Sequence, residues 1–199
     1  MKKILLATNN PDKVEEIRAI LANQPIQLLT PAEVGLSLEV SEDGQTYAEN
    51  ATIKALAFAQ ASGLVSLADD SGLEVEALGG QPGVHSHRYA PWPQATDADR
   101  RKYLLGKLTG IDRPWKAQFR ATIAIAQPGG DVKIASGTCQ GEIIPEERGT
   151  NGFGYDPIFF IASQGKTMAE LSLEEKNLLS HRARAIRNAE GILKDYLQS

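Results

Sequence analysis

Hydrophobic runs, each ended by polar or glycine residues, predict a series of strands along the chain. The first lies within Lys2–Thr8, where no polar residue interrupts four consecutive apolar ones, as in a buried parallel strand. A second run spans residues 64–68. Residues 119–126 and 132–138 flank a Pro-Gly-Gly-Asp turn and predict a β-hairpin, and a last short strand is expected over residues 158–161.

Helical spacing and capping signals predict helices between these strands. Asn10 is expected as an N-cap with Pro11 at the first helical position. A second helix is expected from Thr46, which forms a capping box with Glu49, to Gly63. A third helix is expected over residues 97–109, and a fourth begins at the capping box formed by Ser172 and Glu175. One long helix is expected from Ser180 onward, with Ile186, Leu193 and Leu197 on its core face.

The order of these elements defines the expected fold class. With a short strand and loop over residues 26–44, strands and helices alternate before the hairpin. This order predicts an α/β sheet with a hairpin lobe on one side. Because no repeat, low-complexity tract or linker interrupts residues 1–199, we expect a single domain.

Composition narrows the possible classes of protein. With 42% hydrophobic and 23% charged residues among 199, neither disorder nor a membrane span is indicated. A net charge of −4 disfavours a general nucleic-acid binder. Cys139 is the only cysteine, which excludes an internal disulfide framework and is typical of a reducing compartment. The hydrophobic stretch near Met1 is too short for a signal peptide, so a cytoplasmic protein is expected.

The most informative polar cluster is the adjacent pair Asp69 and Asp70, followed by Ser71-Gly72. We expect the pair at the end of a buried strand that opens into a turn, where α/β proteins present functional groups. Neighbouring carboxylates repel each other, so they need a nearby cation or titrate as a shifted acid–base pair. Asp-Ser-Gly is also ordinary turn chemistry, and that alternative stays open.

Two further clusters point to phosphate and metal chemistry. In the run Thr8-Asn9-Asn10-Pro11-Asp12-Lys13, a strand enters a helix through a polar turn, which suits phosphate oxygens, although the glycines of a Walker A loop are absent. The alternative is that Asn10 acts only as a cap. Glu42 with the aspartate pair offers the hard oxygen ligands that Mg²⁺ prefers, unless Glu42 is a solvated loop charge.

Two clusters in the last third of the chain could recognise a flat ligand. In Gly152-Phe153-Gly154-Tyr155-Asp156-Pro157, the glycines allow close backbone approach while Phe153 stacks and Asp156 accepts hydrogen bonds. The alternative is a bulged turn with a core aromatic ring. The other cluster comprises Lys176 and the run Ser180-His181-Arg182, with basic residues at the start of a helix. Cations there oppose the helix dipole, so we expect an anionic or electron-rich group nearby.

Together these motifs resemble the inosine triphosphate pyrophosphatase family, also called the Ham1-like or non-canonical purine NTP pyrophosphatases. The resemblance covers nearly the whole chain. It rests on Thr8-x-Asn10-x-x-Lys13, Glu49-Asn50-Ala51 with Lys54, Ala68-Asp69-Asp70-Ser71-Gly72-Leu73, Gly152-Phe153-Gly154-Tyr155-Asp156-Pro157, and Glu175-Lys176 followed by Ser180-His181-Arg182.

The resemblance implies Mg²⁺-dependent hydrolysis of ITP, dITP and XTP to the monophosphate and pyrophosphate by water attack on the α-phosphorus. It implies a three-layer α/β/α fold with an elongated mixed sheet, two lobes around a substrate cleft, and a homodimer. Glu42 and Asp70 would hold the metal, and Asp70 would also be the general base. The substrate-binding residues that it implies are Thr8, Asn9, Asn10, Pro11, Asp12, Lys13, Lys54, Ser71, Phe153, Gly154, Tyr155, Asp156, Lys176, His181 and Arg182.

A few positions depart from the family pattern, and other functions compete with it. Asn9 stands where glycine is common, Ser41 stands where a second acid often precedes Glu42, and the stretch His85–Pro93 has unusual residues. These departures bear on the fine substrate preference. The competing interpretations are a pyrimidine or methylated-nucleotide pyrophosphatase, a nucleotide sensor without turnover, and an RNA binder, which the acidic balance disfavours.

Overall fold

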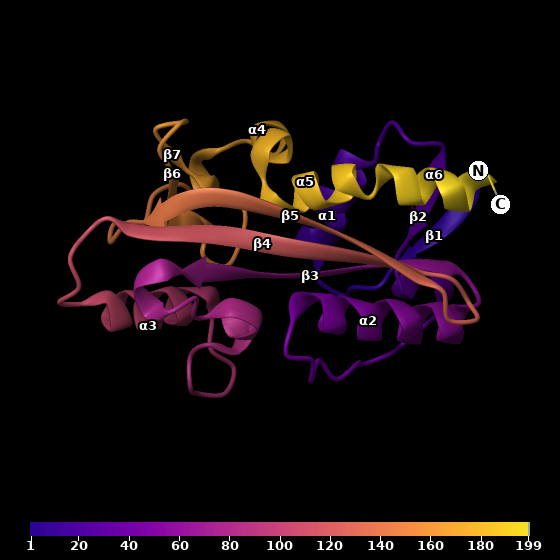
Figure 1. The fold of residues 1–199 in the computed structure, drawn as a ribbon, viewed down its shortest axis with the longest axis horizontal. Helices are drawn as coiled ribbons and strands as arrows, with labels where there is room; N and C mark the ends of the chain where they lie inside the picture. Colours follow the sequence, from indigo (N-terminus) through magenta and orange to yellow (C-terminus); the bar gives the residue numbers. More distant parts are fainter. Residues whose placement is uncertain (199) are drawn as a thin grey trace. The chain divides into compact units, whose positions relative to one another are not determined.

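The computed structural model describes residues 1–198, which contain a mixed seven-stranded sheet. Its strands lie in the order β2-β1-β3-β4-β5-β6-β7 (Figure 1). β1 runs parallel to β2 and β3, whereas β6 runs antiparallel to β5 and β7. The strands are β1 Lys2–Leu6, β2 Ile26–Leu29, β3 Val65–Val75, β4 Trp115–Ala126, β5 Val132–Ile143, β6 Phe159–Ile161 and β7 Lys166–Thr167.

The helices begin where the sequence places their caps. Asn10 caps the first helix through its side-chain oxygen, and capping boxes start α2 at Thr46, α3 at Thr96 and α4 at Ser172. The expected helix over residues 97–109 is confirmed as α3. The helices are α1 Pro11–Ile20, α2 Tyr47–Ser62, α3 Asp97–Leu108, α4 Leu173–Leu179, α5 His181–Asn188 and α6 Glu190–Gln198.

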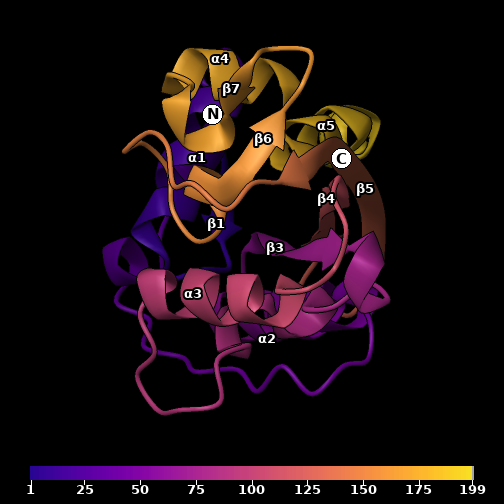
Figure 2. The same ribbon diagram turned by 90° about the vertical axis from the view of Figure 1, so that its left-hand side faces the viewer.

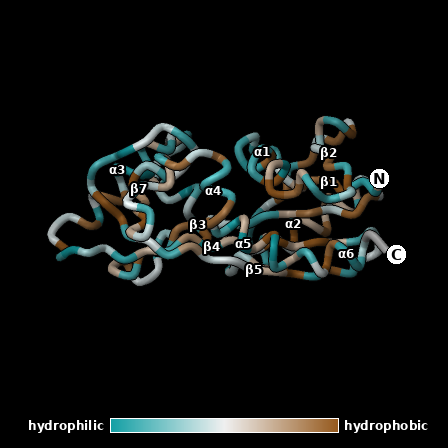
Figure 3. The backbone as a smooth tube through the Cα atoms, turned by 90° about the horizontal axis from the view of Figure 1, so that it is seen from above, coloured by the Kyte–Doolittle hydropathy of each residue, from teal (hydrophilic) through white to brown (hydrophobic). Residues whose placement is uncertain are grey.

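The chain forms two compact units, and β3, β4 and β5 each contribute residues to both. The first unit comprises Met1–Asp70, Ala121–Gly137 and His181–Ser199. The second unit comprises Ser71–Arg120 and Thr138–Ser180. Hydrophobic segments follow the strands and α2 (Figure 3), which is the distribution expected when each unit builds its core around its own part of the sheet.

The first unit has three layers because successive side chains of its strands point to opposite faces. From β1, Leu5 and Ala7 pack against α2, whereas Ile4 and Leu6 pack against α1, α5 and α6. Figure 1 shows α2 on one side of these strands and the other three helices on the opposite side. The three-layer α/β/α arrangement expected from the sequence is therefore present in this unit.

The second unit has one core between α3 and the ends of the longer strands. Leu104 and Leu108 of α3 are fully buried against Tyr155 and Phe159, among other apolar side chains. Figure 2 shows α3 on one side of β3, with β6, β7 and α4 on the other. This packing fixes the position of α3 relative to the segment that carries Tyr155.

The order of β1, β2 and β3 determines where a ligand can bind. From β1 the chain passes through α1 to β2 on one side, and then through α2 to β3 on the other side of β1. Ligands of open α/β sheets bind at such a reversal, beyond the carboxyl ends of the strands. Residues Thr8–Lys13 follow the carboxyl end of β1, and Asp69 lies beside them on β3 because β1 and β3 pair in register from Ile4↔Val65 to Leu6↔Leu67.

Three expectations from the sequence are corrected by the structure. β3 does not end in a turn at Asp70; it continues through Gly72 to Val75, because alternating burial resumes with Leu73 and Val75 fully buried. Both hairpin strands are longer than expected, starting at Trp115 and ending at Ile143. The long terminal helix is interrupted between α5 and α6, where the side-chain amide of Asn188 donates to the carbonyl of Ser136. Ile186 and Leu193 are buried as expected, and the side chain of Leu197 lies outside the described residues.

The close approach of β5 and α5 gives a prediction about Gly137. A Cβ added there would overlap the amide nitrogen of Ala185 and the carbonyl oxygen of His181, and these backbone atoms cannot rotate away. We expect Gly137→Ala to lower the free energy of unfolding by about 2 kcal/mol or more, measured by urea denaturation. Gly106→Ala is the control, because Gly106 lies inside α3 with open space around it and should gain about 0.5–1 kcal/mol. Equal stability of the two variants would contradict the close contact.

Candidate active site

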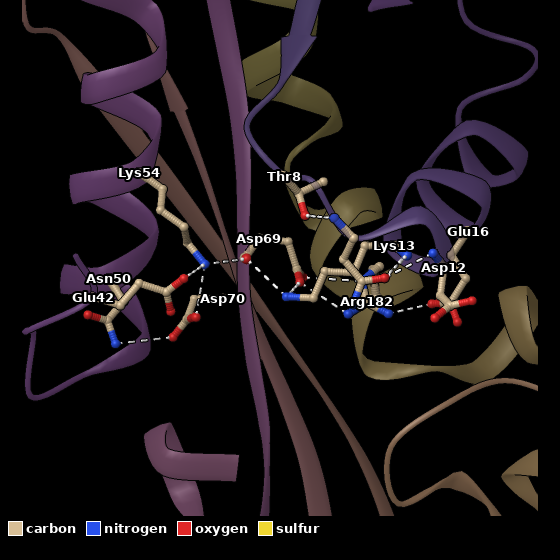
Figure 4. Close-up of polar contacts among 11 residues, drawn as sticks. Thr8, Asp12, Lys13, Glu16, Glu42, Asn50, Lys54, Asp69, Asp70 and Arg182 are labelled. Carbon is tan, nitrogen blue, oxygen red and sulfur yellow. Dashed lines mark hydrogen bonds and ion pairs between the residues drawn. The ribbon is translucent and has the colours of Figure 1, made fainter. Parts of the chain in front are cut away.

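Asp69 and Asp70 are adjacent in β3, so their side chains point to opposite faces of the sheet. Figure 4 shows the consequence, with Lys54, Glu42 and Asn50 on the α2 side of β3 and Lys13, Arg182 and Glu16 on the other. The sequence predicted that adjacent carboxylates need a cation. The structure provides a separate set of cations for each of them.

On the face that α1 and α5 cover, Asp69 belongs to a buried, charge-balanced group. The Lys13 ammonium lies 2.8 Å from Asp69 Oδ2, and Arg182 lies 3.1 Å from the same oxygen and donates to Oδ1 as well. A second nitrogen of Arg182 donates to Glu16, which is also buried. Burial would raise the pKa of Asp69, but Arg182 and Lys13 hold that pKa far below its ordinary value.

On the opposite face, Asp70 belongs to a group with excess negative charge. Lys54 Nζ lies 3.1 Å from Asp70 and 3.2 Å from Glu42, so one cation serves two carboxylates. Asn50 donates to Asp70 at 3.5 Å. Burial and the charge of Glu42 raise the pKa of Asp70 against the effect of Lys54, whereas for Glu42 burial is outweighed by Lys54 and its pKa is lowered.

The group around Asp70 fits a hard divalent cation better than the group around Asp69. Glu42, Asp70 and Lys54 carry a formal charge of about −1, whereas the four charges around Asp69 cancel. In the described part of the chain, no group of three or more His, Cys, Asp and Glu side chains could hold a metal ion. Two carboxylates alone are the protein ligand set of ions such as Mg²⁺ that keep water and substrate oxygens as their other ligands.

The backbone carbonyl of Asp69 joins the two faces. It accepts a hydrogen bond from Lys54 at 2.9 Å and another from Lys13 at 3.3 Å. Near the end of the β1–β3 ladder, Ala7 N donates to Leu67 O, and the chain then turns toward α1. Two lysines, one from each side of the sheet, are thereby brought together at one atom.

The turn between β1 and α1 is organised by its own side chains. Thr8 Oγ1 accepts from the amide of Asn10, and Asn10 Oδ1 accepts from the amides of Asp12 and Lys13. The expectation that Asn10 caps the helix is therefore confirmed. The Thr8 hydroxyl hydrogen and the Asn10 side-chain NH₂ are the groups of this turn that can donate to a phosphate.

The second unit holds the other sequence-predicted residues, apart from His181 and Arg182. Lys176 pairs with Asp156 at 2.5 Å, and its ammonium lies 5.2 Å from the ring centre of Phe153. Asp156 also accepts from the amide of Phe153 at 3.0 Å. Asp156 was expected to accept from a ligand; in the structure it organises the loop that carries Phe153. Ser71, half-buried in β3, is the first residue of this unit.

His181 and Arg182 begin α5 in the first unit, as the sequence predicted. All three guanidinium nitrogens of Arg182 bind Glu16 or Asp69, and the side chain is 1% exposed. The anionic neighbours that the sequence led us to expect here are thus, for Arg182, two carboxylates of the protein itself. A role of these two residues toward a base remains a prediction.

Sequence reasoning missed Glu16 and Asn50. Glu16 lies three residues after Lys13 on α1, a spacing that places both on one helix face and could have paired it with the same cluster. Asn50 is fully buried in the first turns of α2, where its side chain accepts from Gly44 and donates to Asp70. Its burial depends on the packing of the preceding loop, which the sequence pattern does not show.

Taken together, the fold and the first-unit site define an α/β protein with paired lysines and carboxylates at a sheet switch point, a class suited to phosphate esters and anhydrides. Comparison with known proteins specifies the family. Residues 4–191 match the model of the Ham1 family, and the chain belongs to this family. The resemblance seen in the sequence is confirmed.

Solved structures and curated relatives agree with this assignment. A HAM1 protein from Coxiella burnetii is 40% identical with a TM-score of 0.88, over 98% of this chain and all of that one. The Ham1 protein of Staphylococcus aureus is 39% identical with a TM-score of 0.85 over the same shares. A relative named dITP/XTP pyrophosphatase, from Desulforamulus reducens, is 46% identical over 96% of this chain and 95% of its own length. The expected α/β fold with a mixed sheet is thereby confirmed. Among the described residues, no helix is long and apolar enough to cross a membrane.

The opposite pKa shifts of the two aspartates predict opposite effects on stability. Asp69→Asn would leave Lys13 and Arg182 without their shared anion, and we expect a loss of about 3–5 kcal/mol in the free energy of unfolding at pH 7. Because the folded pKa of Asp69 is lowered, its contribution is complete above the unfolded pKa of about 4 and is lost as the pH falls. The difference in the free energy of unfolding between wild type and Asp69→Asn should therefore become smaller as the pH falls from 5 to 3.

Asp70→Asn is the matched control. Its folded pKa is raised, so the ionised carboxylate is less favourable in the folded state and its removal should leave stability at pH 7 unchanged or increased. Chemical denaturation of both variants over this pH range makes the comparison. Equal losses in the two variants would show that the two faces are not electrostatically different.

Proposed function

We propose that this protein hydrolyses non-canonical purine nucleoside triphosphates, namely ITP, dITP and XTP, to the monophosphate and pyrophosphate. The observation that carries the proposal is the buried Asp70 beside Glu42 and Lys54, in a chain whose near-full-length relatives are named dITP/XTP pyrophosphatases. The activity would remove these nucleotides from the nucleotide pool. A substrate of this class also accounts for two lysines at the end of β1.

The chain's own residues supply most of what attack on the α-phosphorus requires. Such a reaction needs a positioned water and neutralisation of charge, with little covalent help from the protein. Asp70 is suited to orient the water and take its proton, because burial raises its pKa toward the working pH. Lys13 and Lys54 would offset the negative charge that builds on the pyrophosphate leaving group.

We propose that Mg²⁺ is the cofactor and that Glu42 and Asp70 hold it. The excess negative charge of this group is the feature that supports a cation there. When bound, the ion supplies charge neutralisation for the phosphate oxygens and lowers the pKa of a ligated water. The turn Thr8–Lys13 would bind the phosphates with the Thr8 hydroxyl, the Asn10 side-chain NH₂ and the positive end of the α1 dipole.

We propose that Phe153 presents its ring to the purine base and that Gly154, Tyr155, Asp156 and Lys176 shape this subsite. An aromatic side chain between two glycines suits stacking on a flat ligand. A donor from His181 would favour a 6-keto group and disfavour the 6-amino group of adenine. Arg182, whose guanidinium binds Glu16 and Asp69, would contribute by holding the start of α5. Ser71, next to Asp70, would complete the substrate-binding set.

The remaining assignments are also proposals that follow from the family. The chain would act as a homodimer in the cytoplasm, with residues 1–199 as a single domain and no nucleic-acid or membrane partner. Light scattering of the purified protein tests the dimer directly. A monomeric mass at assay concentration would refute it without affecting the proposed chemistry.

The proposed activity is tested by the phosphate product released from ITP, XTP, GTP, ATP and dTTP with Mg²⁺. We expect pyrophosphate from ITP and XTP with little from GTP or ATP. Orthophosphate would place the attack at the γ-phosphorus and refute the role of Asp70. Binding without turnover would favour a nucleotide sensor, and preference for dTTP would favour a pyrimidine enzyme.

The role of Asp70 predicts a separation of binding from turnover. Asp70→Asn keeps the size of the side chain but removes the base, so we expect a loss of kcat of about 10²-fold or more while nucleotide binding stays measurable by calorimetry. Asp43→Asn is the control, because Asp43 is exposed next to Glu42 and its carboxylate accepts from the hydroxyl of Ser41. Activity retained in Asp70→Asn would exclude this residue as the base.

The stacking role of Phe153 predicts an effect on KM. Base–aromatic stacking contributes about 1–3 kcal/mol, so Phe153→Ala should raise KM for every purine triphosphate by about 5- to 150-fold. Phe153→Tyr retains the ring and should stay close to wild type. Steady-state kinetics with ITP and XTP measure both variants, and an unchanged KM in Phe153→Ala would refute stacking.

A further inference from the structure

The backbone amide and the backbone carbonyl of Gly154, the residue after Phe153, are both bound by side chains of one helix. The amide of Gly154 donates to Asp97 Oδ2 at 2.7 Å, and its carbonyl accepts from Arg101 Nη1 at 2.8 Å. Asp97 and Arg101 are four residues apart on α3, so they share one face of the helix. Both contacts lie within the second unit.

The loop needs such contacts because its own backbone is permissive. Gly152 and Gly154 both have positive φ, at 72° and 62°, and they flank Phe153 directly. Glycine adopts many conformations at little cost, so a ring between two glycines is not positioned by the local chain alone. Before Gly154 the loop is fixed by Asp156, which accepts from Phe153 N and Lys176. After Phe153, the hydrogen bonds to Asp97 and Arg101 fix the two peptide groups on either side of the Gly154 Cα.

α3 is itself firmly anchored. Leu104 and Leu108, seven residues after Asp97 and Arg101, lie fully buried in the core that also contains Tyr155. The Tyr155 hydroxyl donates to the carbonyl of Ser86 at 2.9 Å, which fixes the residue after Gly154 as well. The polar and apolar contacts of α3 therefore act on the same short segment.

The side chains of Asp97 and Arg101 are themselves held by ion pairs with neighbouring residues. Arg101 binds Glu147 with two nitrogens at 2.9 and 2.8 Å, which orients the guanidinium toward Gly154. Asp97 pairs with Arg100 one turn along the helix. Burial would raise the pKa of Asp97, but the Gly154 amide and Arg100 lower it, which agrees with an ionised acceptor at this position.

We propose that Asp97 and Arg101 are positioning residues of the purine subsite, which hold the backbone amide and carbonyl of Gly154 and thereby fix the ring of Phe153. The inference rests on the proposed function only for the identity of the ligand. The fixed loop is a property of the protein alone. The ligand class is the purine base of the nucleotide, and α3 contributes to its binding without contact with it.

The experiment compares four variants of the full-length protein. Arg101→Met and Asp97→Ala each remove one hydrogen bond to Gly154. Asp97→Asn retains an acceptor oxygen and is the conservative rescue. Lys102→Met removes a positive charge at the next position of the same helix, where the side chain is exposed, and is the charge-matched control. Steady-state kinetics with ITP and amide hydrogen exchange of Gly154 and Phe153 by NMR are measured for each.

We expect Arg101→Met and Asp97→Ala to raise KM for ITP by about 3- to 10-fold with little change in kcat, the effect of one lost hydrogen bond. Amide exchange at Gly154 should be faster in both. Asp97→Asn should recover most of the lost protection, and Lys102→Met should match wild type in both measurements. If Arg101→Met unfolds, Arg101→Lys keeps the charge but not the paired binding of Glu147, and it should show the same effects in weaker form.

Other results would overturn the inference. If the amide hydrogen of Gly154 exchanged at the wild-type rate in Arg101→Met and Asp97→Ala, α3 would not fix the loop. A fall in kcat with unchanged KM, or an equal rise of KM in Lys102→Met, would refute a positioning role at the base. If the wild type itself turned over no purine nucleotide, the proposed function would fail, whereas the exchange measurement would still decide whether these two residues fix the loop.

Discussion

The carbonyl oxygen of Asp69 accepts hydrogen bonds from two lysines, and the arrangement of the first-unit site depends on this one atom. Lys13 comes from α1 and Lys54 from α2, helices that cover opposite faces of the sheet. The chain turns toward α1 soon after β1 ends at Leu6, so Asp69 of β3 lies next to the turn Thr8–Lys13. Two cations from opposite faces of the sheet are thereby brought together beside this turn.

The two faces divide structural and chemical roles between neighbouring residues. Asp69 is matched by Lys13 and Arg182, with Glu16 completing a buried group whose charges cancel. Burial, together with the charge of Glu42, raises the pKa of Asp70 against the effect of the lysines. Alternation along a strand allows one residue to be held ionised and the next to remain reactive, although their backbone atoms are joined. The Asp-Asp sequence needs a strand for this separation, because in a turn both carboxylates could approach the same cation.

Local signals in the sequence were sufficient to predict an element wherever its hydrogen bonds lie within one short segment. The cap at Asn10 and the capping boxes at Thr46 and Ser172 were predicted correctly, because the donors and acceptors lie within four residues. The turn expected after Asp70 was wrong, since the strand is maintained by neighbours far away in the sequence. Glu16 was missed for the same reason, because its partner Arg182 is 166 residues distant. The composition of the site was thus readable, and the pairing within it was not.

Gly137 has a consequence for how changes in the core reach the site. The backbone of β5 lies directly against the backbone of α5 at His181 and Ala185, with no side chain between them. Main-chain atoms in contact cannot adjust by rotamer changes, so this spacing is far stiffer than one set by packed methyl groups. A side chain added at Gly137 would push on the backbone at the start of α5, which carries Arg182. The absence of a side chain on β5 thus helps to set where the guanidinium meets Asp69 and Glu16, although Gly137 makes no contact with any of these charges through a side chain of its own.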